Sequence, residues 1–309
     1  MNDVNLDSSA PRIVPHLWFD KEAGEAAQFY TSVFPESDIT SRVTLGDTPS
    51  GDSEIVSFTI WGRPFMAISA GPLFKFNPAI SFMVNFDPSR ESRAREQLDE
   101  VWDKLSEGGV PLMPLGEYPF SARFGWIRDK YGVTWQLMLT NPEGEPRPTI
   151  IPALMFTGEN AGRAEEARAL YLSVFERSRP GQLQRYGPGM APDREGTVMF
   201  SDFMAENTWL TAMDSAHNHG FTFNEAISLL VRCETQAQID RYWEQLSVVP
   251  EAEQCGWLKD KFGVSWQIAP AVMDEMLAGG TPEQIERVTA AFMKMKKFDI
   301  AKLEQAYRG

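Results

Sequence analysis

Cysteine and histidine are scarce in this chain, and long hydrophobic runs are missing from it. Its 309 residues include two cysteines, Cys233 and Cys255, and three histidines. One distant pair is not a disulfide framework, so both cysteines are expected to be reduced thiols. No run reaches the roughly 18 apolar residues that cross a bilayer, and the first residues have neither the cationic start nor the apolar core of a secretory signal. These features predict a cytoplasmic protein.

Positive charge is also in short supply. Lys and Arg total 29 against 43 Asp and Glu, which gives a formal net charge of -14. A charge of this sign repels phosphate backbones and anionic lipid surfaces. Neither nucleic acid nor a membrane is therefore an expected partner.

What the sequence does contain is an internal repeat. The segment FGWIRDKYGVTWQL at 124–137 returns as CGWLKDKFGVSWQI at 255–268, with eight of fourteen positions identical. A second string, FKFNPAIS at 74–81, returns as FTFNEAIS at 221–228. Because self-similarity at a fixed order reflects a repeated folding unit, the chain is expected to hold two copies of one domain.

The repeat predicts five segments. They are a disordered tail at 1–10, copy one at 11–142, a linker rich in Pro, Gly and charge at 143–149, copy two at 150–270, and C-terminal helices at 271–309. Thr281-Pro282-Glu283-Gln284 predicts the start of one tail helix, because it combines a capping box with Pro at the first helical position. The tail helices either cover their own domain or grip a second chain.

Each copy has the pattern of a strand, a helix and three strands, followed by the same order again. In copy one, an apolar strand at 15–19 precedes a helix at about 22–34, whose apolar residues recur at three- and four-residue spacing. Extended segments follow, and a second helix then ends at Gly108-Gly109. A hairpin that turns at Lys130-Tyr131-Gly132 closes the copy.

This closing hairpin carries a family resemblance. Asp129-x-x-Gly132, followed four residues later by Gln136, is similar to the closing hairpin of vicinal-oxygen-chelate domains, which occur in glyoxalases, ring-cleaving dioxygenases and bleomycin- or fosfomycin-resistance proteins. The strings LWFD, FKFN-AIS and GW-x-x-D-K-(Y/F)-GV-(T/S)-WQ resemble more narrowly the PhnB-like group, often labelled 3-demethylubiquinone-9 3-methyltransferase. The resemblance implies an α+β fold of two tandem glyoxalase-like domains with a C-terminal helical tail. Each domain would consist of two βαβββ modules that form a curved mixed sheet with helices on its outer face.

The methyltransferase label itself is not expected to describe the activity. A bound adenosyl group needs a glycine-rich turn between a strand and a helix, with an acidic residue downstream. No G-x-G is expected to follow a strand in this chain.

The resemblance also indicates where metal ligands would lie, on the first strand of a copy, on the strand that opens its second half, and on its closing strand. The corresponding residues are His16, Ala79 and Gln136 in copy one, and Ala153, Ala226 and Gln267 in copy two. Divalent cations prefer imidazole nitrogens and anionic oxygens, so no metal and no cofactor are expected. His217 and His219 could hold a metal with Asp214, but their polar and glycine neighbours favour a solvated loop.

Strand alternation separates a core face from a pocket face. His16 and Trp18 point away from Leu17 and Phe19, and the closing strand alternates in the same way. The ligand-binding residues predicted from this alternation and from the repeat are His16, Trp18, Thr134, Gln136, Met138, Asn77, Met155, Asn224, Ser265 and Gln267. For the two Asn residues, a cap at a strand entry and a place at the pocket rim are equally consistent.

An aromatic, Met-containing surface with a few neutral polar groups suits a flat or apolar ligand. The expected function is therefore metal-independent binding of a small apolar or aromatic molecule. An enzyme of lyase, isomerase or dioxygenase type with an altered site, and a purely structural role, are the alternatives. The chain would act either as a homodimer or as an internal pseudo-dimer.

Overall fold

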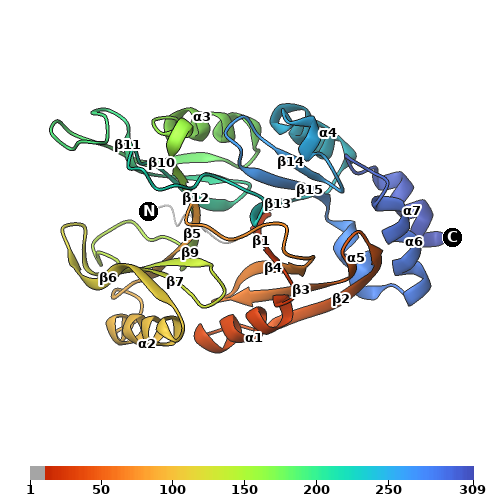
Figure 1. Ribbon diagram of the computed structural model, residues 1–309, viewed down its shortest axis with the longest axis horizontal. Coiled ribbons are helices and arrows are strands. Elements are labelled where there is room, and N and C mark those ends of the chain that lie inside the picture. The colour runs from red at the N-terminus through yellow and green to blue at the C-terminus, as the bar shows by residue number, and fades with distance from the viewer. Residues whose placement is uncertain (1–10) are drawn as a thin grey trace, which may run out of the picture.

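The computed structural model of the protein describes residues 11–309, and Figure 1 shows its two curved sheets with the helices around them. The tail predicted at 1–10 lies outside the described residues. Sheet A has seven strands and sheet B has eight. The α+β class is thus confirmed. Among the described helices, none has both the length and the apolar character needed to cross a bilayer.

Copy one supplies eight strands and two helices, in the order that the sequence predicts. Its first half consists of β1 (Ile13–Phe19), α1 (Ala23–Val33), β2 (Ile39–Thr48), β3 (Gly51–Ile60) and β4 (Arg63–Ser69). Its second half consists of β5 (Ile80–Phe86), α2 (Ala94–Ser106), β6 (Val110–Tyr118), β7 (Ser121–Arg128) and β8 (Thr134–Leu139).

Copy two repeats this order with one strand fewer. Its first half consists of β9 (Ile150–Phe156), α3 (Ala164–Val174), β10 (Arg179–Arg185), β11 (Val198–Ala205) and β12 (Thr208–Asp214). Its second half consists of β13 (Ile227–Cys233), α4 (Gln236–Leu246), β14 (Trp257–Lys259) and β15 (Ser265–Pro270). A 3-10 turn at Pro250–Ala252 takes the place of a counterpart to β6. The connection from α4 to β14, at 247–256, is shorter than the equivalent connection at 107–120 that contains β6.

Each sheet combines the first half of one copy with the second half of the other copy. Sheet A has the order β14-β15-β13-β1-β4-β3-β2, and sheet B has the order β10-β11-β12-β9-β5-β8-β7-β6. The halves join where β1 pairs antiparallel with β13 and where β5 pairs antiparallel with β9. The expectation that each copy forms its own sheet is therefore wrong in this detail. β5 (ISFMVNF) and β13 (ISLLVRC) are equivalent strands of the repeat and are both largely apolar, so strand pattern alone does not determine which of them pairs with β1.

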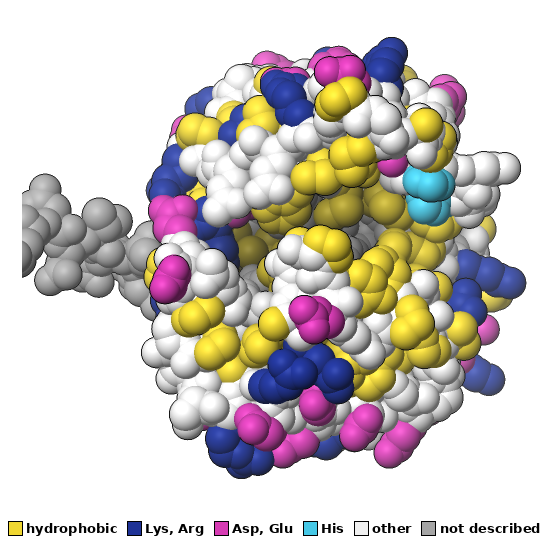
Figure 2. Space-filling view, turned by 90° about the vertical axis from the view of Figure 1, so that its left-hand side faces the viewer, with side chains coloured by type: hydrophobic (Ala, Val, Ile, Leu, Met, Phe, Trp, Pro, Cys, Tyr) yellow, Lys and Arg dark blue, Asp and Glu magenta, His cyan; other side chains and the backbone are white. Residues whose placement is uncertain are grey.

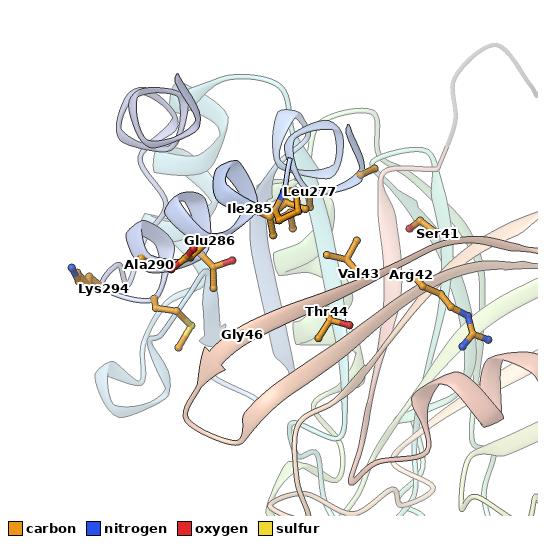
Figure 3. A pocket seen from close by; sticks show the side chains of 14 residues that line it. Ser41, Arg42, Val43, Thr44, Gly46, Leu277, Ile285, Glu286, Ala290 and Lys294 are labelled. Atoms are coloured by element: carbon orange, nitrogen blue, oxygen red, sulfur yellow. The ribbon is translucent and has the colours of Figure 1, made fainter. Parts of the chain in front are cut away.

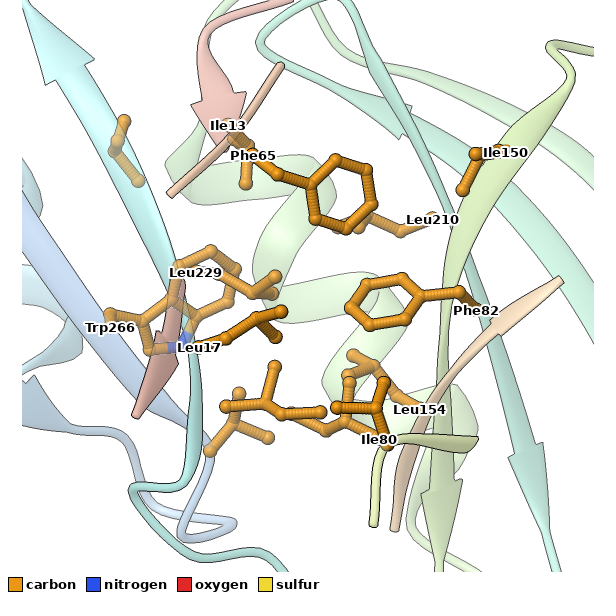
Figure 4. Packing of buried hydrophobic residues seen from close by; sticks show 14 of the residues in the cluster. Ile13, Leu17, Phe65, Ile80, Phe82, Ile150, Leu154, Leu210, Leu229 and Trp266 are labelled. Carbon is orange, nitrogen blue, oxygen red and sulfur yellow. The ribbon is translucent and has the colours of Figure 1, made fainter. Parts of the chain in front are cut away.

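A common hydrophobic core lies between the backs of the two sheets. Figure 4 shows Leu17, Leu229 and Trp266 of sheet A facing Phe82 and Leu154 of sheet B. All five side chains are completely buried. The residues with the opposite alternation, among them those predicted for the pocket face, therefore lie on the hollow side of each sheet.

A buried carboxylate holds the Asp-x-x-Gly turn of each copy. Asp129 is 3% exposed and accepts hydrogen bonds from Tyr30 Oη at 2.9 Å, from Trp135 Nε1 at 2.8 Å and from two backbone N–H groups of the turn. Asp260 has the equivalent four donors in copy two. This part of the repeated motif thus joins the closing hairpin to the first helix of its copy.

The C-terminal tail forms α5 (Val272–Gly279), α6 (Pro282–Phe292) and α7 (Ile300–Arg308), and the capping box at Thr281 is present. At the side of sheet A, α5 lies beside β2 and β15, α6 lies beside β2, and α7 packs on α6 (Figure 1). The N–H groups of Cys255 and Gly256 donate to the carbonyls of Met295 and Lys296 at 2.9 and 2.7 Å. The tail therefore docks on a sheet of its own chain.

We expect Gly256→Ala to loosen this docking. Gly256 has φ of 81°, and a Cβ atom there would lie 2.4 Å from Phe298 Cε2. Strain and the clash together should lower the free energy of unfolding by about 3 kcal/mol, measured by urea denaturation, and hydrogen exchange should rise at 296–309. Gly263→Ala is the matched control, because φ is 84° there and nothing lies within 4 Å of the added atom. An equal loss in both variants would show that the contact with Phe298 is unimportant.

Candidate functional site

In each sheet, site residues of copy one lie beside site residues of copy two. His16 on β1 lies opposite Ser228 on β13, and Gln267 on β15 donates from Nε2 to Ser228 Oγ at 2.8 Å. In sheet B, Ala153 lies opposite Ser81, and Gln136 donates from Nε2 to Ser81 Oγ at 2.7 Å. The expected grouping of His16 with Gln136 is therefore wrong, because these residues belong to different sheets.

The amide-hydroxyl pairs include two serines that sequence reasoning missed. Ala79 and Ala226, the positions transferred from the family pattern, are buried at strand entries two residues earlier. Ser81 and Ser228 end the repeated strings FKFNPAIS and FTFNEAIS, and that repetition was the available signal. A strand residue two positions further on points to the same face.

His16 is the one imidazole on the hollow side of sheet A among the described residues. It is 3% exposed, and its ring lies edge-on to Trp257 with centroids 5.6 Å apart. Burial lowers its pKa to about 4, since the charged form loses its hydration. Trp18 lies beside the same Trp257 ring and donates from Nε1 to the Gly71 carbonyl at 2.8 Å. His16 is therefore a neutral, buried histidine beside the rings of Trp18 and Trp257.

These donors do not fit a divalent cation. Sheet A offers one imidazole with a hydroxyl and an amide, and sheet B offers no imidazole at Ala153. Within residues 11–309, no group of three His, Cys, Asp or Glu side chains could hold a metal ion. Cations of this kind need several anionic or imidazole ligands.

The other two histidines lie in the loop after β12, apart from Asp214. His219 Nε2 lies 2.8 Å from Ser215 Oγ, and His217 Nε2 lies 3.7 Å from Asp193 Oδ2. Asp214 instead accepts hydrogen bonds from backbone N–H groups. The hypothesis that Asp214 and the two histidines form one metal site is not supported by these contacts.

Sheet B encloses an open hollow. Met83, Ile151 and Trp209 form a buried cluster separate from the main core, and Met138, Phe200 and Met204 pack against it. Figure 2, which views the molecule from this side, shows a depression lined by hydrophobic side chains between the two arms of the sheet. Gln136 points to this face of the sheet, as its alternation with Trp135 and Leu137 predicts.

The hollow of sheet A is covered by the tail. Its cluster contains Val14, Met66 and Leu230, and the ion pair between Arg232 Nε and Asp274 Oδ2, at 2.7 Å, joins β13 to α5. Between β2 and the helices α5 and α6 lies a pocket of about 730 Å³ (Figure 3). The two hollows of this pseudo-symmetric fold therefore differ in access.

The remaining predicted residues are placed as follows. Asn77 donates from Nδ2 to the Thr222 carbonyl at 2.9 Å, and Asn224 donates to the Lys75 carbonyl at 2.8 Å. The Oδ1 atom of each Asn accepts the N–H of the residue two positions later. Each Asn therefore caps the entry of its own strand and also hydrogen-bonds to the equivalent segment of the other copy. Three further predicted residues are almost fully buried: Thr134, Met155 and Ser265.

The fold is that of glyoxalase-like, vicinal-oxygen-chelate proteins. Glyoxalase I from Zea mays superposes with a TM-score of 0.52 over 86% of this chain and 95% of its own, at 12% identity. The profile of the 3-demethylubiquinone-9 3-methyltransferase family matches residues 11–138 and 148–269, so the chain belongs to that family. The resemblance expected from the sequence is thereby confirmed.

A solved structure of higher sequence identity matches less than half of this chain. The PhnB protein from Bacillus cereus is 37% identical over 43% of this chain and 100% of its own, with a TM-score of 0.36. No curated protein matches the chain. The tail helices lie outside both matched segments.

Proposed function

We propose that this protein binds a small, largely apolar or aromatic molecule in the hollow of sheet B without using a metal ion. The observation that carries the proposal is the cluster of Met83, Ile151 and Trp209, which is apolar yet separate from the folding core. Apolar side chains on the hollow face of a sheet, outside the core between the two sheets, can line a pocket for a small molecule.

The composition of the hollow suits a flat ligand. Methionine side chains adapt to aromatic surfaces, and the partly buried Met138, Phe200 and Met204 pack at the edge of the cluster. Gln136 supplies polarity without charge, because its amide has two N–H donors and one acceptor, and the bond to Ser81 uses one donor. A ligand would therefore be held by apolar contact and oriented by one or two hydrogen bonds.

The family name supports no methyl transfer here. The expectation that no G-x-G follows a strand is wrong, because Gly187-Pro188-Gly189 follows β10. This turn leads through a loop into the strand β11 and not into a helix. An adenosyl cofactor needs such a turn at the start of a helix, where N–H groups and the helix dipole receive the ligand. Binding is thus the function that the residues of the hollow favour.

Binding can be tested with the uncharged fluorophore N-phenyl-1-naphthylamine. Met83→Ala should weaken binding about fivefold to tenfold, because it removes about 1 kcal/mol of apolar contact. Leu230→Ala, at the equivalent position of sheet A, should leave the affinity within twofold. Fluorescence titration with and without EDTA measures both effects. Loss of binding after chelation, or stoichiometric Zn, Fe, Mn or Ni in the purified protein, would contradict the proposal.

A further inference from the structure

The linker between the two copies places an arginine over the hollow of sheet B. Arg147 lies outside both segments that match the family profile, in a stretch whose composition predicts a flexible connection. Its side chain is nevertheless only 10% exposed. The guanidinium carbon lies 4.3 Å from the centroid of the Trp209 ring, in cation-π distance. Arg147 therefore contacts the same tryptophan that belongs to the apolar cluster of the hollow.

Two edges of the Arg147 guanidinium are occupied, and a third is not. Nε donates to Asp202 Oδ2 at 2.6 Å, and Nη1 lies 2.8 Å from Glu145 Oε2. Nη2 is buried and has no hydrogen-bond partner among the described residues. Because a buried N–H group of a charged side chain is costly to leave unsatisfied, this edge is suited to an acceptor that arrives with a ligand.

The charges near Trp209 favour an anionic acceptor. Asp202, 3% exposed at its side chain, balances Arg147, and its Oδ1 also accepts the Gln182 N–H. A second guanidinium, that of Arg179, lies 4.8 Å from the Trp209 centroid. Glu145 opposes these cations, but it is 62% exposed and is screened by solvent. The net charge of -14 repels anions at long range, so an anion must be held by short contacts of this kind.

We propose that Arg147 makes the hollow of sheet B selective for molecules that join an aromatic or apolar body to a carboxylate or sulfonate group. This inference rests on the proposed function. The body packs on Met83 and the partly buried Met138 and Met204, and the anionic group accepts hydrogen bonds from Arg147 Nη2 with Arg179 nearby. Since the linker supplies Arg147, this anion subsite requires the fusion of the two copies.

Two fluorophores that share one aromatic skeleton separate charge from shape. 8-Anilino-1-naphthalenesulfonate is N-phenyl-1-naphthylamine with an added sulfonate. Arg147→Met should raise the Kd of the sulfonate about tenfold and change the Kd of the uncharged probe less than twofold. Arg185→Met is the matched control. Arg185 lies on β10, the strand that also carries Arg179, but it pairs with the exposed Glu165. It should leave both affinities unchanged.

A second variant distinguishes loss of the anion subsite from misfolding caused by an unpaired buried charge. Arg147→Met leaves Asp202 without its cation, whereas the double variant Arg147→Met/Asp202→Asn removes the buried pair together. The double variant should show the same selective loss of sulfonate binding. Equal weakening of both probes, or sulfonate binding that does not respond to either variant, would overturn the role of Arg147 while leaving the hollow as an apolar site. Failure of the wild-type protein to bind either probe would overturn the proposed function and this inference together.

Discussion

Asp260→Ala is expected to lower the free energy of unfolding by about 3–5 kcal/mol, the largest effect of any single substitution considered for this fold. The Asp260 carboxylate is 1% exposed and accepts from Tyr171 Oη at 2.7 Å, from Trp266 Nε1 at 2.9 Å, and from the backbone N–H groups of Phe262 and Val264. Alanine would leave four donors without an acceptor in a site that water does not reach. It would also release the closing hairpin of copy two from α3.

Urea denaturation followed by tryptophan fluorescence measures this effect. Asp103→Ala is the control, because Asp103 is exposed on α2, and its loss should change the free energy of unfolding by less than about 0.5 kcal/mol. Asp260→Asn should fall between the two, since an amide oxygen still accepts while its NH₂ group faces other donors. A loss below about 1 kcal/mol for Asp260→Ala would show that the four hydrogen bonds add little to stability.

The second large effect is a pH dependence due to His16. Its pKa falls from 6.5 to about 4 because burial disfavours the charged ring. A group whose folded pKa is lowered contributes its full stability above the unfolded pKa, and that contribution is lost as pH falls toward the folded pKa. The free energy of unfolding should therefore decrease by about 3 kcal/mol between pH 6.5 and pH 4 on account of this residue alone.

Comparison with His16→Leu isolates the contribution of the imidazole. Buried carboxyl groups also titrate; burial raises the pKa of Asp129 and Asp260, for example, so that their contribution changes with pH in the opposite sense. These groups are common to both proteins and cancel in the difference. The stability of wild type relative to His16→Leu should thus fall with acidification from pH 6.5 to pH 4. A difference that stays constant over that range would mean that His16 is solvated or already protonated in the folded state.

Because each sheet combines halves of both copies, each hollow contains residues from both copies. Gln136, Ser81 and Met83 come from copy one, whereas Ile151 and Trp209 come from copy two. A substitution in either copy therefore acts on the same hollow. The tail removes the equivalence of the two hollows, because it covers sheet A and leaves sheet B open (Figures 1 and 2).

Local features of the fold were determined by the sequence. The repeated order of strand, helix and strands, the tail helix that begins after Thr281, and the side of the sheet on which His16 and Gln136 lie all follow from periodicity and capping chemistry. Each of these features depends on residues a few positions apart. A pattern of side chains along one element is therefore enough to predict them.

Only the tertiary structure decided which residues meet. The repeat makes β5 and β13 equivalent, largely apolar strands, so either could pair with β1. Strand periodicity does not distinguish a sheet within one copy from a sheet shared between two. Arg147 likewise lies in a segment without periodicity, and its burial depends on Asp202 and Trp209, which are distant in sequence. The pairing of distant strands depends on the packing energy of both copies together. No single segment of the sequence contains enough information to predict that energy.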